Sequence, residues 1–121
     1  MTEIKSILLI DNSEIDNFIN HKIAENYGVT NIVTFKSADT ALDFLLKTKI
    51  KFQFIIVDLC LPIMDGFQFI DKFNELELHK TQGEICLLSA SINPTHKKQS
   101  AERNVRFIEK PLTIEKLLIK H

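Results

Sequence analysis

Four side chains that suit phosphoryl chemistry lie at the ends of apolar runs in this chain. Two are carboxylates, one is a hydroxyl and one is an ammonium: Asp11, Asp58, Ser89 and Lys110. Close carboxylates raise each other's pKa unless a cation lies between them, and Mg²⁺ prefers such oxygen ligands. A carboxylate can also attack phosphorus to form an aspartyl phosphate, while a metal ion and a lysine neutralise the phosphoryl oxygens. Brought together by folding, these residues would form a phosphoryl-acceptor site.

The apolar runs that precede these residues have the length and composition of buried strands. Continuous short runs without polar alternation are typical of parallel strands covered by helices on both faces. The three strongest runs are 7–10, 54–57 and 85–88, and two weaker strand candidates are 31–35 and 105–108. The candidate side chains therefore follow strands rather than helices.

Helical spacing fills the segments between these runs. Ser13 or Asp11 is predicted to cap a first helix that ends at Gly28, a residue suited to left-handed backbone conformation. The apolar residues of this helix recur on a single stripe, which is the pattern of a helix face that packs on a core. The stripe consists of Ile15, Phe18, Ile19, Ile23 and Tyr27.

Four further helices are predicted, and one of them is unusual. They begin after Ser37, near Asp65, after Asn93 and after Thr113. The helix that follows Asn93 has almost no apolar stripe over 95–103. Because little burial stabilises it, we expect this helix to be loosely held.

Strands and helices alternate strictly in the predicted order. Such alternation favours an α/β domain with a parallel sheet and right-handed crossovers. We expect a flavodoxin-like (βα)₅ three-layer sandwich whose five strands have the order 2-1-3-4-5. Ligands of such sheets bind beyond the carboxyl ends of the strands, which is where the four candidate side chains fall. We expect residues 1–121 to form a single domain with no output domain attached.

The composition argues against several classes of function. The 121 residues include 15 basic and 16 acidic side chains, so the formal charge of −1 gives no general reason to bind nucleic acid. The apolar runs are far shorter than the roughly 20 residues that a membrane-spanning helix requires. The N-terminus lacks the apolar region of a signal peptide, and two cysteines make no disulfide framework. We therefore expect a cytoplasmic protein that binds neither nucleic acid nor membrane.

The candidate residues lie within motifs that resemble a known family. The string Val-Asp-Leu-Cys-Leu-Pro-Ile-Met-Asp-Gly occupies 57–66. It is accompanied by Leu-Leu-Ile-Asp-Asn at 8–12, Leu-Ser-Ala at 88–90 and Glu-Lys-Pro at 109–111. With these motifs in this order, the chain resembles the response-regulator receiver domains of two-component signalling, and closely resembles the stand-alone chemotaxis-regulator type. The resemblance covers essentially the whole chain.

The resemblance implies a role for each residue that would meet the phosphoryl group. Asp58 would be the phosphoacceptor, and Ser89 and Lys110 would contact the phosphoryl oxygens and act in the switch. Phe107 matches the aromatic residue that turns inward on activation. The peptide bond before Pro111 is expected to be cis, as in the family, because a cis bond is plausible only before proline.

The resemblance also implies a Mg²⁺ site, with one departure. The ligands would be Asp11, Asn12, Asp58 and the backbone carbonyl of Cys60. Receivers usually carry a second acid where this chain has Asn12. The amide oxygen of Asn12 can coordinate a metal ion but brings no charge, so we expect weaker Mg²⁺ binding than in the family.

By the same resemblance, the protein is expected to be a signalling domain rather than an enzyme, although it would assist its own phosphorylation and dephosphorylation. A partner histidine kinase or phosphotransfer protein would supply the phosphoryl group. The face formed by the fourth helix, the fifth strand and the fifth helix would then change and regulate an unidentified downstream protein. We expect a monomer or a weak dimer.

Two alternatives differ in class from this interpretation. A pseudo-receiver would serve as an interaction scaffold without taking phosphate, and Asn12 is its support. A haloacid-dehalogenase-like phosphatase would use an aspartate after the first strand and an acid two residues later. This chain has Asp11 but then Ser13 at the second position, which disfavours that enzyme.

Several other residues have simpler interpretations. Asp16, Asp39 and Asp71 fall on predicted helices and are interpreted as solvated. Cys60 and Cys86 are interpreted as buried thiols rather than as a redox pair.

Overall fold

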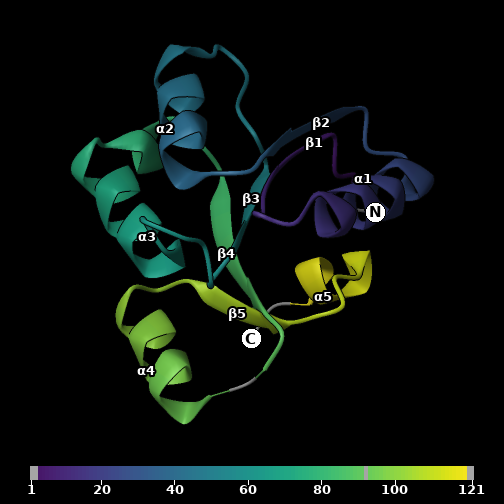
Figure 1. The fold of residues 1–121 in the computed structure, drawn as a ribbon. Coiled ribbons are helices and arrows are strands. Elements are labelled where there is room, and N and C mark those ends of the chain that lie inside the picture. Colours follow the sequence, from purple (N-terminus) through teal and green to yellow (C-terminus); the bar gives the residue numbers. More distant parts are fainter. Residues whose placement is uncertain (1–2, 92, 120–121) are drawn as a thin grey trace.

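Five parallel strands alternate with five helices in the computed structural model, which describes residues 3–91 and 93–119 (Figure 1). The strands form one sheet in the order β2-β1-β3-β4-β5, which confirms the predicted flavodoxin-like topology. The elements in chain order are β1 (Ser6–Ile10), α1 (Glu14–Tyr27), β2 (Asn31–Phe35), α2 (Ala38–Lys47), β3 (Phe54–Asp58), α3 (Gly66–Glu75), a short 3₁₀ turn η1 (Leu78–Lys80), β4 (Glu84–Ser89), α4 (Pro94–Glu102), β5 (Arg106–Glu109) and α5 (Ile114–Leu118).

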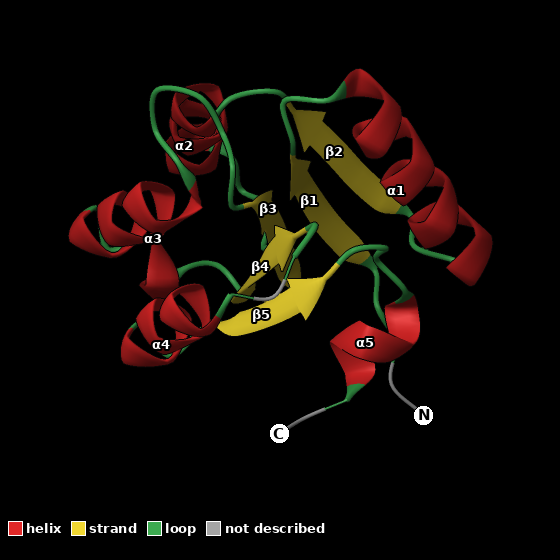
Figure 2. Ribbon diagram, turned by 60° about the horizontal axis from the view of Figure 1, so that its bottom comes forward, coloured by secondary structure: helices red, strands yellow, loops and turns green. Residues whose placement is uncertain are grey.

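Helices cover both faces of the sheet. α2, α3 and α4 lie on one side, and α1 and α5 lie on the other (Figures 1 and 2). Because successive side chains of a strand point to opposite faces, β1 supplies Leu8 to the apolar cluster under α2 and α3 and Leu9 to the cluster on the other face. The central strands β1, β3 and β4 are almost wholly buried, as their continuous apolar runs predict.

β3 and β4 extend one residue beyond the apolar runs that predict them. Asp58 and Ser89 are the last residues of these strands, as expected. The parallel ladder continues past the apolar runs because Asp58 pairs with Leu88 and Ser89 pairs with Glu109. Both candidate side chains are therefore held by the hydrogen-bonded sheet, which is more rigid than a loop.

Capping interactions set the ends of the helices. Ser13 rather than Asp11 caps α1, because its hydroxyl oxygen accepts a hydrogen bond from the backbone N–H of Asp16 at 3.1 Å. Gly28 ends the helix at φ 112°, in the left-handed conformation predicted for it. Asp65 begins α3 with a complete capping box. These caps fix where α1 and α3 leave the edge of the sheet that holds the candidate residues.

The orientation of α1 contradicts the prediction. Its buried residues are Asn17, Asn20 and Ala24, whereas most of the predicted core stripe faces outward. The exposed fractions are 71% for Ile15, 63% for Phe18, 47% for Ile19 and 45% for Tyr27, and Ile23 alone of the stripe packs on the core. The Asn17 side-chain amide donates to the backbone carbonyls of Asp11 at 2.9 Å and Phe35 at 3.2 Å. These polar contacts anchor α1 to the ends of β1 and β2 and turn most of its apolar stripe outward.

α4 has the small buried area that its sequence predicts. Ser100 is its buried residue in the part of the chain that the structure describes. At the end of α4, Arg103 donates to both carboxylate oxygens of Asp71 on α3, at 2.9 and 3.0 Å, and lies 4.8 Å from the centre of the Phe67 ring. Asp71 is exposed, as interpreted, although its carboxylate pairs with Arg103. An ion pair and a cation–π contact hold α4 where apolar burial does not.

Candidate functional site

Three carboxylates surround the ammonium of Lys110. The Lys110 Nζ atom lies 2.9 Å from Asp16 Oδ2, 3.1 Å from Asp58 Oδ1 and 3.3 Å from Asp11 Oδ2. The residues come from four parts of the chain: the end of β1, the first turn of α1, the end of β3 and the segment after β5. The structure therefore brings together Asp11, Asp58 and Lys110, which the sequence predicts to share a site.

The sheet register explains this convergence. Ile10 of β1 pairs with Val57 of β3, so Asp11 and Asp58 follow at the same level on neighbouring strands. Lys110 reaches this level because its backbone N–H donates to the carbonyl of Ser89 at 2.7 Å. The Lys110–Pro111 peptide bond is cis, which confirms the expectation.

Burial and charge shift the pKa values of this group. The Asp11 and Asp58 side chains are 6% and 11% exposed, and the Lys110 side chain is 24% exposed. Burial raises the pKa of Asp11, and the neighbouring Asp58 adds to this, although a hydrogen bond from the Ser13 backbone N–H opposes it. Burial alone lowers the pKa of Lys110, but its hydrogen bonds to Asp16 and Asp58 outweigh this and raise the pKa above its usual value. The lysine is thus a fixed positive charge at neutral pH.

Ser89 joins the site through the backbone rather than through its side chain. Its hydroxyl is buried and donates to the backbone carbonyl of Ser91 at 3.0 Å. Phe107 on β5 is half-buried, and its ring centre lies 6.5 Å from that of His96 on α4. Ser89 and Phe107 therefore lie on neighbouring strands, with Ser89 leading into the segment before α4.

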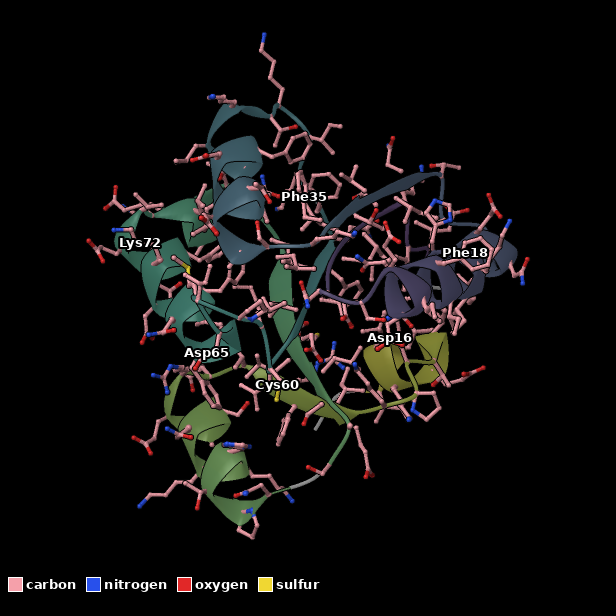
Figure 3. All side chains as sticks on the ribbon, viewed as in Figure 1. Asp16, Phe18, Phe35, Cys60, Asp65 and Lys72 are labelled. Atoms are coloured by element: carbon pink, nitrogen blue, oxygen red, sulfur yellow. The ribbon has the colours of Figure 1, made fainter. Side chains whose placement is uncertain are left out.

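Asn12 and Cys60 line an open pocket beside the carboxylates. The pocket has a volume of about 620 Å³, and its wall includes Asp65, Phe67 and the ring of His96. Cys60 is exposed, so its interpretation as a buried thiol is wrong, whereas Cys86 is buried as expected. Figure 3 shows Cys60 between the start of α3 and the strand β5. Two of the predicted metal ligands, Asn12 and Cys60, thus line one opening at the carboxyl edge of the sheet.

The donor atoms at this edge fit a hard divalent cation. The two buried carboxylates of Asp11 and Asp58 share one ammonium, so they lie close enough to favour a further positive charge. Within residues 3–91 and 93–119, no three His, Cys, Asp or Glu side chains form a metal-binding group. A cation here would therefore take two carboxylates together with uncharged oxygens from Asn12 and the Cys60 carbonyl, which is a set that suits Mg²⁺.

Asp16 is a site residue that the sequence interpretation missed. Its carboxylate makes the shortest of the three contacts to Lys110, so the interpretation of Asp16 as solvated is wrong. The signal was its position in the first turn of the helix that follows Asp11, because that turn begins at the same edge of the sheet. Asp39, by contrast, is exposed as expected.

A family model decides what this arrangement is. The model of the response regulator receiver domain matches residues 7–120. The chain belongs to the response-regulator receiver family. Receivers are signalling domains of two-component systems rather than classical enzymes. No helix in the described ranges of this receiver is both long and apolar enough to cross a membrane.

Known proteins resemble this receiver in sequence and in structure. It is 30% identical over 112 residues to the two-component response regulator 24 of Arabidopsis thaliana. The matched segment covers 92% of this chain and 77% of the relative. The chemotaxis protein CheY4 of Vibrio cholerae has a similar structure, with a TM-score of 0.80, 23% identity and coverage of 96% and 94% of the two chains. The receiver domain of the Arabidopsis histidine kinase CKI1, in complex with Mg²⁺, gives a TM-score of 0.81 at 18% identity, covering 94% and 88%.

Proposed function

We propose that this receiver accepts a phosphoryl group on Asp58 from a histidine kinase or a phosphotransfer protein, with Mg²⁺ as cofactor. The observation that supports the proposal best is the contact of 3.1 Å between Asp58 Oδ1 and Lys110 Nζ, next to the buried Asp11. A nucleophile, a positive charge and oxygen ligands for a metal ion are the groups that phosphoryl transfer to a carboxylate requires. The structure of a receiver domain of similar fold in complex with Mg²⁺ supports the choice of metal.

The transfer step follows from the positions of these groups. A carboxylate oxygen of Asp58 attacks the phosphorus of a phosphohistidine, so a P–O bond forms while the P–N bond breaks. The imidazole leaves with the bonding pair and takes a proton from solvent. Lys110 faces the attacking carboxylate, since its ammonium already contacts Asp58, and from there it neutralises a phosphoryl oxygen. Bound Mg²⁺ would supply further charge neutralisation at the phosphoryl oxygens.

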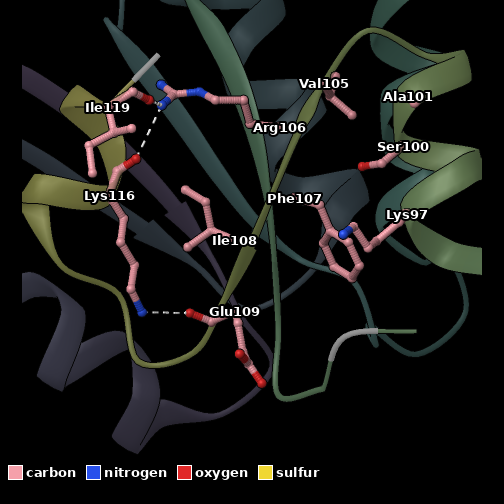
Figure 4. Close-up of a pocket in the computed structure, with 10 residues that line it drawn as sticks. All are labelled: Lys97, Ser100, Ala101, Val105, Arg106, Phe107, Ile108, Glu109, Lys116 and Ile119. Atoms are coloured by element: carbon pink, nitrogen blue, oxygen red, sulfur yellow. Dashed lines mark hydrogen bonds between the residues drawn. The ribbon is translucent and has the colours of Figure 1, made fainter. Parts of the chain in front are cut away.

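The output of this step is a change of the α4–β5–α5 face. A phosphoryl oxygen on Asp58 competes with the Ser91 carbonyl for the hydroxyl of Ser89, and Ser89 leads directly into the segment before α4. α4 buries little of its surface, so moving the helix costs little free energy. Phe107 lies on β5 in a pocket of about 390 Å³ that borders both α4 and α5 (Figure 4). A downstream protein that binds this pocket would read the phosphorylation state.

The exposed apolar stripe of α1 supplies a surface for the phosphodonor protein. Ile15, Phe18 and Ile19 are exposed on the helix that begins three residues after Asp11. An apolar helical surface of the donor bound there brings its histidine to the edge of the sheet that holds Asp58. Exposed apolar patches beside a polar site are typical of protein interfaces.

The free thiols of Cys60 and Cys86 agree with a cytoplasmic location for this exchange.

A labelling experiment tests the proposal. The full chain is incubated with phosphoramidate, with and without Mg²⁺, and the intact mass is measured for the wild type and for Asp58→Asn. We expect one added phosphoryl group in the wild type with Mg²⁺ and none in Asp58→Asn. Asp39→Asn is the matched control, since it makes the same change at an exposed helical position. Undiminished labelling of Asp58→Asn would overturn the proposal, and Mg²⁺ binding without any labelling would favour the scaffold alternative.

A further inference from the structure

Asp16 has an ion pair that neither the motifs nor the proposed transfer step explains. Its carboxylate on α1 makes the shortest contact to Lys110, at 2.9 Å, and its side chain is 39% exposed. Figure 3 shows Asp16 on α1, where the helix faces α5. The contact brings a third negative charge to a lysine that already bridges Asp11 and Asp58.

The three contacts put the lysine and a metal ion in competition. The ammonium of Lys110 lies on the same carboxylates, Asp11 and Asp58, that a divalent cation at this edge requires. If these were its only partners, every Mg²⁺ ion would have to displace the ammonium from both. Asn12 adds no charge to offset that competition. A third carboxylate outside the pair changes this balance, because it gives the ammonium a partner that the cation does not need.

We propose that Asp16 is a positioning residue that retains Lys110 when Asp11 and Asp58 bind a divalent cation. This inference rests on the proposed function insofar as that function places Mg²⁺ at these carboxylates. With Asp16 present, the ammonium keeps one strong hydrogen bond as the cation takes the other two partners. Without Asp16, the ammonium withdraws onto Asp11 and Asp58 and opposes the cation directly. Asp16 acts through Lys110 and is not itself a metal ligand.

The neighbouring Glu14 provides a matched control. It lies in the same first helical turn as Asp16, but its carboxylate pairs with Lys36 at 2.8 Å and is 79% exposed. Glu14→Gln therefore removes the same unit of charge from nearly the same place without touching Lys110. Solvent and salt screen an exposed charge of this kind at physiological ionic strength.

The test is a titration of the full chain with Mg²⁺, followed by the amide chemical shifts in ¹H–¹⁵N NMR spectra. We expect Asp16→Asn to raise the Kd for Mg²⁺ by about three- to tenfold, as the loss of a partly exposed charge contact suggests. Glu14→Gln is expected to change it by less than about twofold. The same spectra report whether each variant keeps the fold, since Asp16→Asn preserves the backbone N–H that Ser13 caps.

A second substitution separates positioning from a general effect of charge. Lys110→Met removes the competing ammonium, so Asp16→Asn in that background is expected to change the Kd for Mg²⁺ by less than about twofold. The inference is overturned if the wild type binds no Mg²⁺, if Asp16→Asn behaves like Glu14→Gln, or if its effect is the same with and without Lys110. These outcomes are independent of labelling at Asp58, so a receiver that binds Mg²⁺ through this device but takes no phosphoryl group contradicts the proposed function alone.

Discussion

Lys110 determines the charge balance of the site at the scale of single residues. One ammonium faces the carboxylates of Asp11, Asp16 and Asp58, so the group retains net negative charge and attracts a cation. Because the pKa of Lys110 is raised, the lysine stays charged throughout the neutral range. The pKa of Asp11 is raised mainly by burial, and a bound cation would oppose this shift because an opposite charge favours the ionised carboxylate.

The two cysteines are predicted to differ sharply in reactivity. Burial raises the pKa of the Cys86 thiol to about 12, and its side chain is inaccessible. Cys60 is exposed at the carboxyl edge of the sheet. Since the thiolate is the reactive form, iodoacetamide at pH 8 is expected to modify Cys60 alone in the folded chain and both residues in urea.

Peptide mapping by mass spectrometry measures this difference, and the chain unfolded in urea serves as the control. Raising the pH toward 10 should still leave Cys86 unmodified, because the pKa of its thiol lies higher. Modification of Cys86 at a rate equal to that of Cys60 under native conditions would contradict the burial described here.

At the scale of elements, α1 and α4 have unusual surfaces, and both begin at the carboxyl edge of the sheet. α1 buries asparagines and exposes its apolar stripe, while α4 buries little and is tied to α3 by the pair of Arg103 and Asp71. The first arrangement leaves an apolar surface for a partner near the site. The second leaves a helix that can move when the site changes. The two helices thus suit input and output respectively.

The α1 surface leads to a prediction about transfer from a protein donor. Phe18→Ser removes an exposed aromatic ring, so the free energy of unfolding should change by less than about 1 kcal/mol. If the stripe binds the phosphodonor protein, kcat/KM for phosphotransfer from that protein should fall by about tenfold or more. The rate with phosphoramidate, which needs no docking surface, should stay unchanged.

Leu46→Ser is the matched control for this experiment, because Leu46 is also an exposed apolar side chain, at 52%, but lies on α2. Both rates, with the protein donor and with phosphoramidate, are measured by quenching the reactions at intervals and separating the products by gel electrophoresis. An equal loss in the two variants, or a parallel loss with phosphoramidate, would show that α1 does not dock the donor.

At the scale of the whole molecule, the sequence predicts the fold well, because parallel strands buried on both faces appear in it as continuous apolar runs. The runs at 7–10, 54–57 and 85–88 are apolar on both faces, and the structure buries them on both faces. The convergence of Asp11, Asp58 and Lys110 follows from the topology, since parallel strands end at one edge.

Other features lie beyond sequence reasoning for physical reasons. Periodicity shows that α1 has an apolar stripe, but only the contacts of Asn17 with β1 and β2 decide which face turns inward. The contact of Asp16 with Lys110 joins residues 94 positions apart, and neither residue signals the other locally. Ile63 has left-handed backbone at φ 68° with its side chain fully exposed, which no propensity of a β-branched residue suggests. Tertiary contacts decide the first two of these features.

The most direct test of the central claim is a crystal structure of the full chain with Mg²⁺ and beryllofluoride, a mimic of the phosphoryl group on aspartate. We expect beryllium to be bonded to a carboxylate oxygen of Asp58, with Lys110 Nζ within hydrogen-bonding distance of a fluorine. We also expect Mg²⁺ on Asp11 and Asp58. A structure in which beryllofluoride leaves Asp58 free, with Lys110 still bridging the same carboxylates, would contradict the claim.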